Sequence, residues 1–207
     1  YNTKDLANNA NFQKAINFLR DEVADAKANG MWTIVGFHKP LYTGASHISD
    51  GDVIAYRKLL NPILTELDVD MVLAGHDHVY SRGFVDAQGN NATDINKDLT
   101  QNQNQPTFNH VVNAPFHMVA EHAGGLKWYQ PKAYTVTDGD PIALNYEFLD
   151  KNSSTEDSAS YMKKEQTYVI VEMRPEEAHF TAYKFKYDAA TDAITTEPYV
   201  YDQFTIL

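Results

Sequence analysis

The sequence predicts an α/β fold with a β-rich C-terminal end. Apolar residues recur at three- and four-residue spacing over residues 12–29, which predicts an amphipathic helix that ends near Gly30. Residues 31–37 and 69–74 are short apolar runs typical of buried strands, with a second helix between them. The order helix, strand, helix, strand indicates parallel strands, and sheets of that kind gather their ligands at the carboxyl ends of the strands.

The second predicted helix begins near Asp52, after a loop rich in Gly, Ser and Asp. Its predicted apolar face consists of Tyr56, Leu59, Leu60, Ile63 and Leu67. Pro62 falls inside this pattern, and because proline cannot donate a backbone hydrogen bond, we expect a kink or a restart there.

The last third of the chain predicts strands. Residues 167–173 and 179–187 flank a turn at residues 175–177, and the second of these runs alternates apolar with polar side chains. Residues 194–206 offer a further strand. Between these strands and the first half, residues 96–105 are rich in Asn and Gln, and residues 153–160 are polar, so we expect both segments to be exposed connections.

Composition bounds the function. The 207 residues are 43% hydrophobic and 12% aromatic, which is typical of one globular domain of ordinary size. The formal charge of −11 argues against nucleic acid as a partner, and the apolar runs are too short for a membrane span. A phosphate ester remains a reasonable substrate if metal ions supply local positive charge. The absence of cysteine excludes disulfides, thiolate nucleophiles and cysteine-bound zinc.

Three histidines follow the two predicted strands. The run V-x-x-H ends at His38, and the run G-H-x-H-x-Y-x-R, residues 75–82, contains His76 and His78. Imidazoles on rigid strand ends have the fixed ring direction that zinc, iron and manganese ligands need. Any one histidine is more often an ordinary polar residue, but the two motifs on consecutive strands together predict a metal site.

These two motifs resemble the C-terminal half of the calcineurin-like metallophosphoesterases, and within them the purple acid phosphatase branch. The resemblance implies the C-terminal part of a four-layer α/β/β/α metallo-dependent phosphatase sandwich. It implies two bridged metal ions (Fe, Zn or Mn), with His38 and His76 on one and His78 on the other. The implied reaction is hydrolysis of phosphate monoesters, with diesters as a second substrate class. It also implies a secreted or cell-surface location of bacterial type.

Two further residues gain a role from the resemblance. A histidine in the loop that holds His47 contacts the phosphate or protonates the leaving alcohol in this family, a task that suits an imidazole. The alternative for His47 is an exposed loop histidine. Arg82 is a candidate for phosphate contact, and its alternative is a structural partner beneath the site. We interpret Asp77 as a turn residue or a support outside the ligand set.

The family's remaining ligands come from Asp and Asn motifs in its N-terminal half, and those motifs do not occur here. We therefore interpret residues 1–207 as the C-terminal portion of one domain, truncated or cleaved from a longer enzyme. We expect a motif-bearing α/β part at 12–83, an insertion-rich part at 84–165 and a β-rich end at 166–207. We expect this chain alone to be inactive, with no metal or partial occupancy, and to self-associate through apolar surface that the missing half would cover.

Two other functions stay open. Because the carboxylate ligands are absent, the chain could be a non-catalytic interaction module that keeps the phosphoesterase scaffold. Alternatively, the three histidines could form a mononuclear zinc hydrolase, since catalytic zinc commonly has three protein ligands. We assign no role at the site to the other histidines of interest, which are His110, His117, His122 and His179, and we interpret Trp32 and Trp128 as packing residues.

Overall fold

A computed structural model describes residues 3–90, 92, 107–120, 129, 148–149, 165–188, 190–191 and 193–207. The helical elements are α1 (Thr3–Ala7), α2 (Ala10–Ala28), the 3₁₀ turn η1 (Ser46–Ser49) and α3 (Gly51–Glu66). The strands are β1 (Ile34–Phe37), β2 (Met71–Ala74), β3 (Tyr80–Phe84), β4 (Thr107–Phe108), β5 (Phe116–Ala120), β6 (Phe148–Leu149), β7 (Glu165–Met173), β8 (Ala178–Asp188), β9 (Ala193–Ile194) and β10 (Tyr199–Ile206). The predicted helix–strand order and the β-rich end are confirmed.

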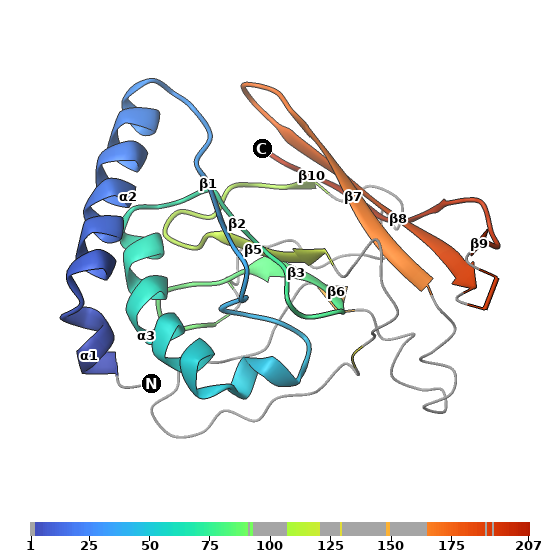
Figure 1. The fold of residues 1–207 in the computed structure, drawn as a ribbon. Helices are drawn as coiled ribbons and strands as arrows, with labels where there is room; N and C mark the ends of the chain where they lie inside the picture. Colours follow the sequence, from blue (N-terminus) through green and yellow to red (C-terminus); the bar gives the residue numbers. More distant parts are fainter. Residues whose placement is uncertain are drawn as a thin grey trace.

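The elements stack in layers. Helices α2 and α3 lie on one side of a first sheet, and a second sheet lies on the other side of it (Figure 1). The first sheet has the order β1-β2-β5-β3-β6, and the second has the order β4-β10-β8-β7. A helix layer followed by two packed sheets agrees with the predicted phosphatase sandwich. Within the described residues, helices cover the first sheet only.

The first sheet is parallel where the sequence predicted it. Strands β1, β2 and β5 run parallel, with Phe37 opposite Ala74, and β3 runs antiparallel to β5. Strand β3 was not predicted, because its five residues are all buried and include a glycine and an arginine, so they show no alternation.

Strand β1 differs from its prediction as a buried strand. Among the described strands it pairs with β2 alone, so it forms an edge of the sheet. Its Ile34 is 47% exposed, and the apolar side chains of Met31 and of Phe18 on α2 are exposed as well. An exposed strand edge beside exposed apolar side chains is a surface on which another chain can pair.

Helix α2 has the ends that its sequence indicates. The side chain of Asn9 caps its first turn by accepting from the backbone of Asn11 and Phe12. At the other end Gly30 has φ of +63°, and Met31 donates back to the carbonyl of Ala26 at 2.9 Å. This is a Schellman ending, in which glycine avoids the cost of a left-handed conformation.

Helix α3 begins where predicted but buries a different face. It continues through Pro62, so the expected restart does not occur. The predicted face is only partly buried. The fully buried side chains are those of Val53, Ala55, Arg57, Asn61, Leu64 and Thr65, three of which are strongly polar. They are tolerated because backbone carbonyls accept their hydrogen bonds. Arg57 and Asn61, for example, donate to loop carbonyls.

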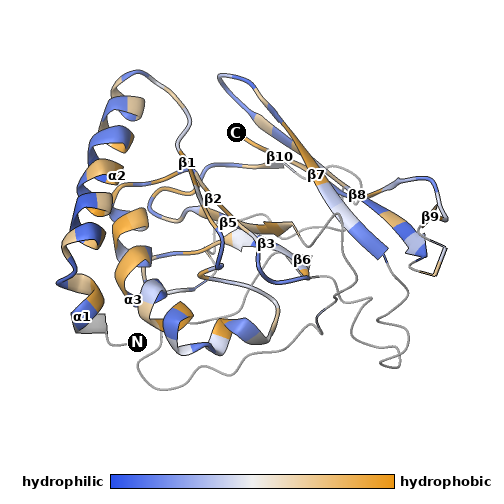
Figure 2. Ribbon diagram, viewed as in Figure 1, coloured by the Kyte–Doolittle hydropathy of each residue, from blue (hydrophilic) through white to orange (hydrophobic). Residues whose placement is uncertain are grey.

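The main core lies between the two sheets. It is rich in phenylalanine, with Phe84 and Phe116 from the first sheet meeting Phe108, Phe180 and Phe204 from the second. The rings of Phe180 and Phe204 stack with centroids 4.6 Å apart. Figure 2 shows hydrophobic residues along β2 and β5 and hydrophilic residues over much of α2. The alternating tail strands therefore supply one face to this core, as predicted.

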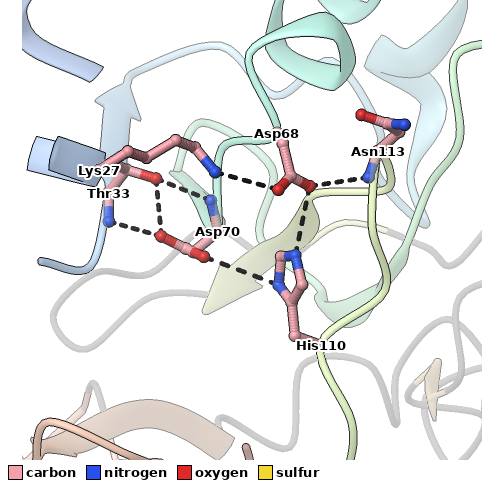
Figure 3. Close-up of polar contacts among 6 residues, drawn as sticks. All are labelled: Lys27, Thr33, Asp68, Asp70, His110 and Asn113. Carbon is pink, nitrogen blue, oxygen red and sulfur yellow. Dashed lines mark hydrogen bonds and ion pairs between the residues drawn. The ribbon is translucent and has the colours of Figure 1, made fainter. Parts of the chain in front are cut away.

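A polar cluster ties the amino ends of β1 and β2 to the segment before β5 (Figure 3). It consists of Lys27, Thr33, Asp68, Asp70, His110 and Asn113. Asp68 accepts from Lys27 at 3.0 Å and from the Asn113 amide at 2.7 Å. His110 lies between the two carboxylates, 3.2 Å from Asp68 and 3.6 Å from Asp70. This cluster occupies the end of the sheet opposite His38 and Gly75, so His110 is a structural residue.

Candidate metal centre

Strand pairing brings His38 and His76 together. Because Phe37 lies opposite Ala74 in the parallel pair β1–β2, the next residues of both strands leave the sheet at the same edge. The amide of Gly75 donates to the His38 carbonyl at 3.0 Å and extends the pairing by one step. The two motifs recognised in the sequence are therefore neighbours because their strands are neighbours.

The sharp turn lies at His76, not at the glycine before it. His76 has φ of +67°, a left-handed conformation that is uncommon for a residue with a Cβ. A Cβ added to Gly75 would meet the nearest atoms at 3.8 Å, which is ordinary contact. Backbone strain of this kind costs about 1–3 kcal/mol and is often found where a side chain must be aimed at a site.

The two imidazoles face each other at ligand distance. His38 Nε2 lies 3.1 Å from His76 Nδ1, and the rings meet edge-on with centroids 5.0 Å apart. Metal–nitrogen bonds of about 2.0–2.1 Å place two imidazole nitrogens on one ion roughly 3 Å apart, so this pair fits a shared ion. Burial lowers the pKa of His76, and the His47 and His38 imidazoles lower it further, against the effect of Asp77. A lowered pKa favours the neutral ring that metal binding requires.

His78 is close to the pair in sequence, and its ring lies beside Tyr129, with centroids 4.7 Å apart. Within the described residues, no three His, Asp or Glu side chains converge in a way that could hold a metal ion. The described donor set is therefore the His38–His76 pair, with the imidazole of His78 two residues further along the chain. The chemistry of two metal ions and a hydroxide calls for carboxylates in addition to these rings.

His47 joins this group from a different element. It lies in η1, its ring centroid is 4.5 Å from that of His76, and Tyr129 is 4.9 Å away on another side. Its Nδ1 forms a hydrogen bond with Oδ1 of Asp77, which is fully buried. The side chain of His47 is 24% exposed, so it is not the freely exposed loop histidine of the alternative interpretation.

The loop that carries His47 is packed, although its composition suggested an open connection. The buried guanidinium of Arg57 on α3 donates to the carbonyls of Leu41 and Ile48, at 2.8 and 3.1 Å. These bonds fasten both halves of the loop to α3. No local pattern indicated this role, because a single arginine on a helix normally faces solvent.

Comparisons with known proteins bear on the fold and on the motif-bearing part of the chain. Residues 2–80 match the family model of the calcineurin-like phosphoesterases. The similarity to this family therefore covers the part of the chain that contains His38, His76 and His78. Its fold is similar to that of purple acid phosphatase PPD1 from seeds of yellow lupin (Lupinus luteus), with a TM-score of 0.53 and 18% identity. That match covers 92% of this chain and 27% of the phosphatase chain, so this chain spans about a quarter of its length. No curated protein matches the chain in sequence.

Arg82 is the last residue of the G-H-x-H-x-Y-x-R motif, but its side chain is bound in the core and not beside the histidines. It is 1% exposed, between the two sheets, and its guanidinium binds Asp202 through Nε at 2.7 Å and Nη2 at 3.2 Å. Tyr80 donates to the same carboxylate at 2.8 Å, and the guanidinium stacks over Phe204 at 4.2 Å. This burial supports the alternative of a structural partner beneath the site, and phosphate contact by Arg82 stays a prediction.

The remaining described histidines lie away from this group. His117 is buried in β5 against Tyr42, and His179 bonds to Thr205 and Gln203 on β10. His122 and Trp128, like the predicted insertions at 96–105 and 153–160, lie outside the described residues. Tyr129, which touches two site histidines, had no motif to mark it in the sequence.

Proposed function

We propose that this chain contributes to the metal-dependent hydrolysis of phosphate esters, with monoesters as the preferred class. The observation that carries the proposal is the 3.1 Å pairing of His38 and His76 at the carboxyl ends of neighbouring parallel strands. His38 and His76 would hold one metal ion and His78 a second. The family match over residues 2–80 supports phosphoester hydrolysis as the reaction class.

The residues of this chain have distinct tasks in that reaction. The bound metal ions would supply Lewis acidity and an activated water. Hydrolysis forms a bond from a water oxygen to phosphorus, breaks the bond from phosphorus to the ester oxygen, and leaves an alkoxide that must gain a proton. His47, beside the metal-binding pair, is placed to interact with that leaving oxygen and to give it a proton.

We propose that the site is completed by an N-terminal half outside this chain. Three observations support this. The described donor set contains imidazoles but no converging carboxylate, the chain spans about a quarter of the lupin phosphatase, and β1 offers an unpaired edge within the described part. The exposed side chains of Met31 and Ile34 at this edge, and of Phe18 on α2, would be covered in the whole enzyme, and in the isolated chain they would promote self-association.

Two observations bear on whether the protein is secreted or lies at the cell surface. No helix among the described residues is long and apolar enough to cross a membrane. The likeness to a purple acid phosphatase supports a secreted or cell-surface location, and the absence of cysteine is consistent with it.

The test compares this chain with the longer protein that contains it. Both are loaded with iron, zinc or manganese, analysed for metal, and assayed with an aryl phosphate. We expect the longer protein to bind about two metals and to be active, and His76→Ala to abolish activity. His179→Ala, on the outer face of the second sheet, is the matched control and should leave activity intact. Full activity in the His76→Ala variant would refute the proposal.

A non-catalytic interaction module remains the competing function, and the lack of a converging third ligand in the described residues favours it. It predicts that no Asp and Asn ligand motifs are encoded upstream of this chain. It also predicts that the longest protein that contains this chain neither binds two metals nor hydrolyses an aryl phosphate.

A further inference from the structure

Asp77 occupies an unusual position between two candidate metal ligands. Its side chain is fully buried, and Oδ1 bonds to Nδ1 of His47. Oδ2 is also buried and has no hydrogen-bond partner among the described residues. A buried carboxylate is costly to desolvate, so its bond to His47 is the contact that compensates for this placement.

We propose that Asp77 is the positioning residue of His47. A carboxylate that accepts from Nδ1 fixes both the orientation and the tautomer of an imidazole ring, and it leaves Nε2 as the nitrogen that can meet a substrate. The ring so held lies close to both His76 and Tyr129, with centroids 4.5 and 4.9 Å away. This inference rests on the proposed function, in which His47 serves the leaving-group oxygen.

The turn at His76 explains how one short motif supplies both roles. The left-handed conformation of His76 and the bond from the Asp77 amide to the Gly75 carbonyl, at 2.7 Å, reverse the chain tightly. Consecutive side chains then point in different directions. His76 turns toward His38, while Asp77 turns inward, beneath the loop that carries His47.

A purely structural role for the Asp77–His47 bond is the main rival. The loop backbone, however, is already held by Arg57, which donates to the carbonyls of Leu41 and Ile48. Breaking the bond between Asp77 and His47 therefore frees an imidazole ring more than it frees the loop. The expected consequence is a loss of catalysis at the leaving group, with substrate binding and folding retained.

The leaving group is the sharpest probe of this role. A 4-nitrophenolate ion departs readily without a proton, whereas an alkoxide does not. In the metal-loaded longer protein, we expect Asp77→Asn to lower kcat for an alkyl phosphate by about 10–100-fold. The kcat for 4-nitrophenyl phosphate and both KM values should change little. His47→Asn should show the same selectivity, and the double variant should be no worse than His47→Asn alone.

The matched control is Asp52→Asn, which breaks the ion pair between Lys39 and Asp52 at the two ends of the same loop without touching the His47 ring. It should not discriminate between the two substrates. Equal losses of kcat on both substrates in Asp77→Asn, or a loss of bound metal by elemental analysis, would overturn the inference. The second result would make Asp77 a metal ligand.

A spectroscopic measurement separates this inference from the proposed function. Nuclear magnetic resonance of the imidazole nitrogens should show a His47 Nδ1–H proton that is shifted downfield by its carboxylate partner and lost in Asp77→Asn. If the wild-type protein hydrolyses neither phosphate, the proposed function fails while this signal still supports the geometry. If the signal is absent in wild type, Asp77 does not position His47.

Discussion

Acid should destabilise this protein through one buried histidine, His117. The residue lies in the middle of the first sheet, opposite Val72 of β2 and Gly83 of β3. Its side chain is 2% exposed, its ring meets Tyr42 edge-on at 4.9 Å, and Nε2 has no hydrogen-bond partner among the described residues. Burial lowers the pKa of His117 to about 3.

The direction and the size of this loss of stability follow from the difference between the folded and the unfolded pKa of His117. The pKa of His117 is about 3 in the folded chain and about 6.5 in the unfolded chain, so the unfolded state binds the proton more strongly between these values. Stability is unaffected by this group above about pH 6.5 and falls as the pH drops toward 3. At about 1.36 kcal/mol per pH unit, the loss is about 2 kcal/mol at pH 5 and about 4 kcal/mol at pH 3, where the folded chain itself is half protonated.

The perturbation is His117→Leu, which removes the titrating ring and fills a similar volume. Urea unfolding at pH 7 and pH 5, followed by tryptophan fluorescence, gives the free energy of unfolding at each pH. The decrease from pH 7 to pH 5 should be about 2 kcal/mol smaller in the variant than in wild type. Met118→Leu, the next residue on the same strand, is the control for repacking and should leave the wild-type decrease unchanged. An undiminished decrease in His117→Leu would refute the argument.

Two further predictions concern stability. Asp202→Asn removes the charged partner that the buried Arg82 guanidinium binds and should lower the free energy of unfolding by about 3–5 kcal/mol. Glu66→Gln, which breaks an exposed ion pair to α2, should have no measurable effect. Equal effects of the two variants in denaturant unfolding would contradict this assignment. Asp68→Ala should lower the free energy of unfolding by about 1–2 kcal/mol. It should also speed hydrogen exchange at the Asn113 amide, which donates to Asp68 at 2.7 Å. Unchanged exchange at this amide would show that the cluster in Figure 3 does not anchor the segment before β5.

Many of the helices and strands could be predicted from the sequence, because the patterns that indicate them lie within single elements. The three- and four-residue spacing of α2, the apolar runs of β1 and β2 and the alternation of β8 each depend on neighbours within one element. The two histidine motifs are local as well, since each follows its own strand. Their meeting was predictable because parallel neighbours place their carboxyl ends at one edge.

The less accurate predictions share a cause. Helix α3 buries a more polar face than its apolar pattern indicated, because distant carbonyls accept hydrogen bonds from Arg57 and Asn61. Strand β1 was expected to be buried but forms an edge, since exposure depends on which other strands are present and not on its own residues. The burial of Arg82 was likewise not visible in the motif, because it depends on Asp202, 120 residues away.

The sequence by itself therefore determined the α/β order, the strand-end positions of His38, His76 and His78, and the resemblance that names the chemistry. Only the tertiary structure decided that His38 and His76 face each other, that Asp77 holds His47, and that Arg82 lies in the core. The physical reason is that periodicity and turns are encoded between near neighbours. Hydrogen bonds and burial are settled between residues whose separation along the chain leaves no trace in local pattern.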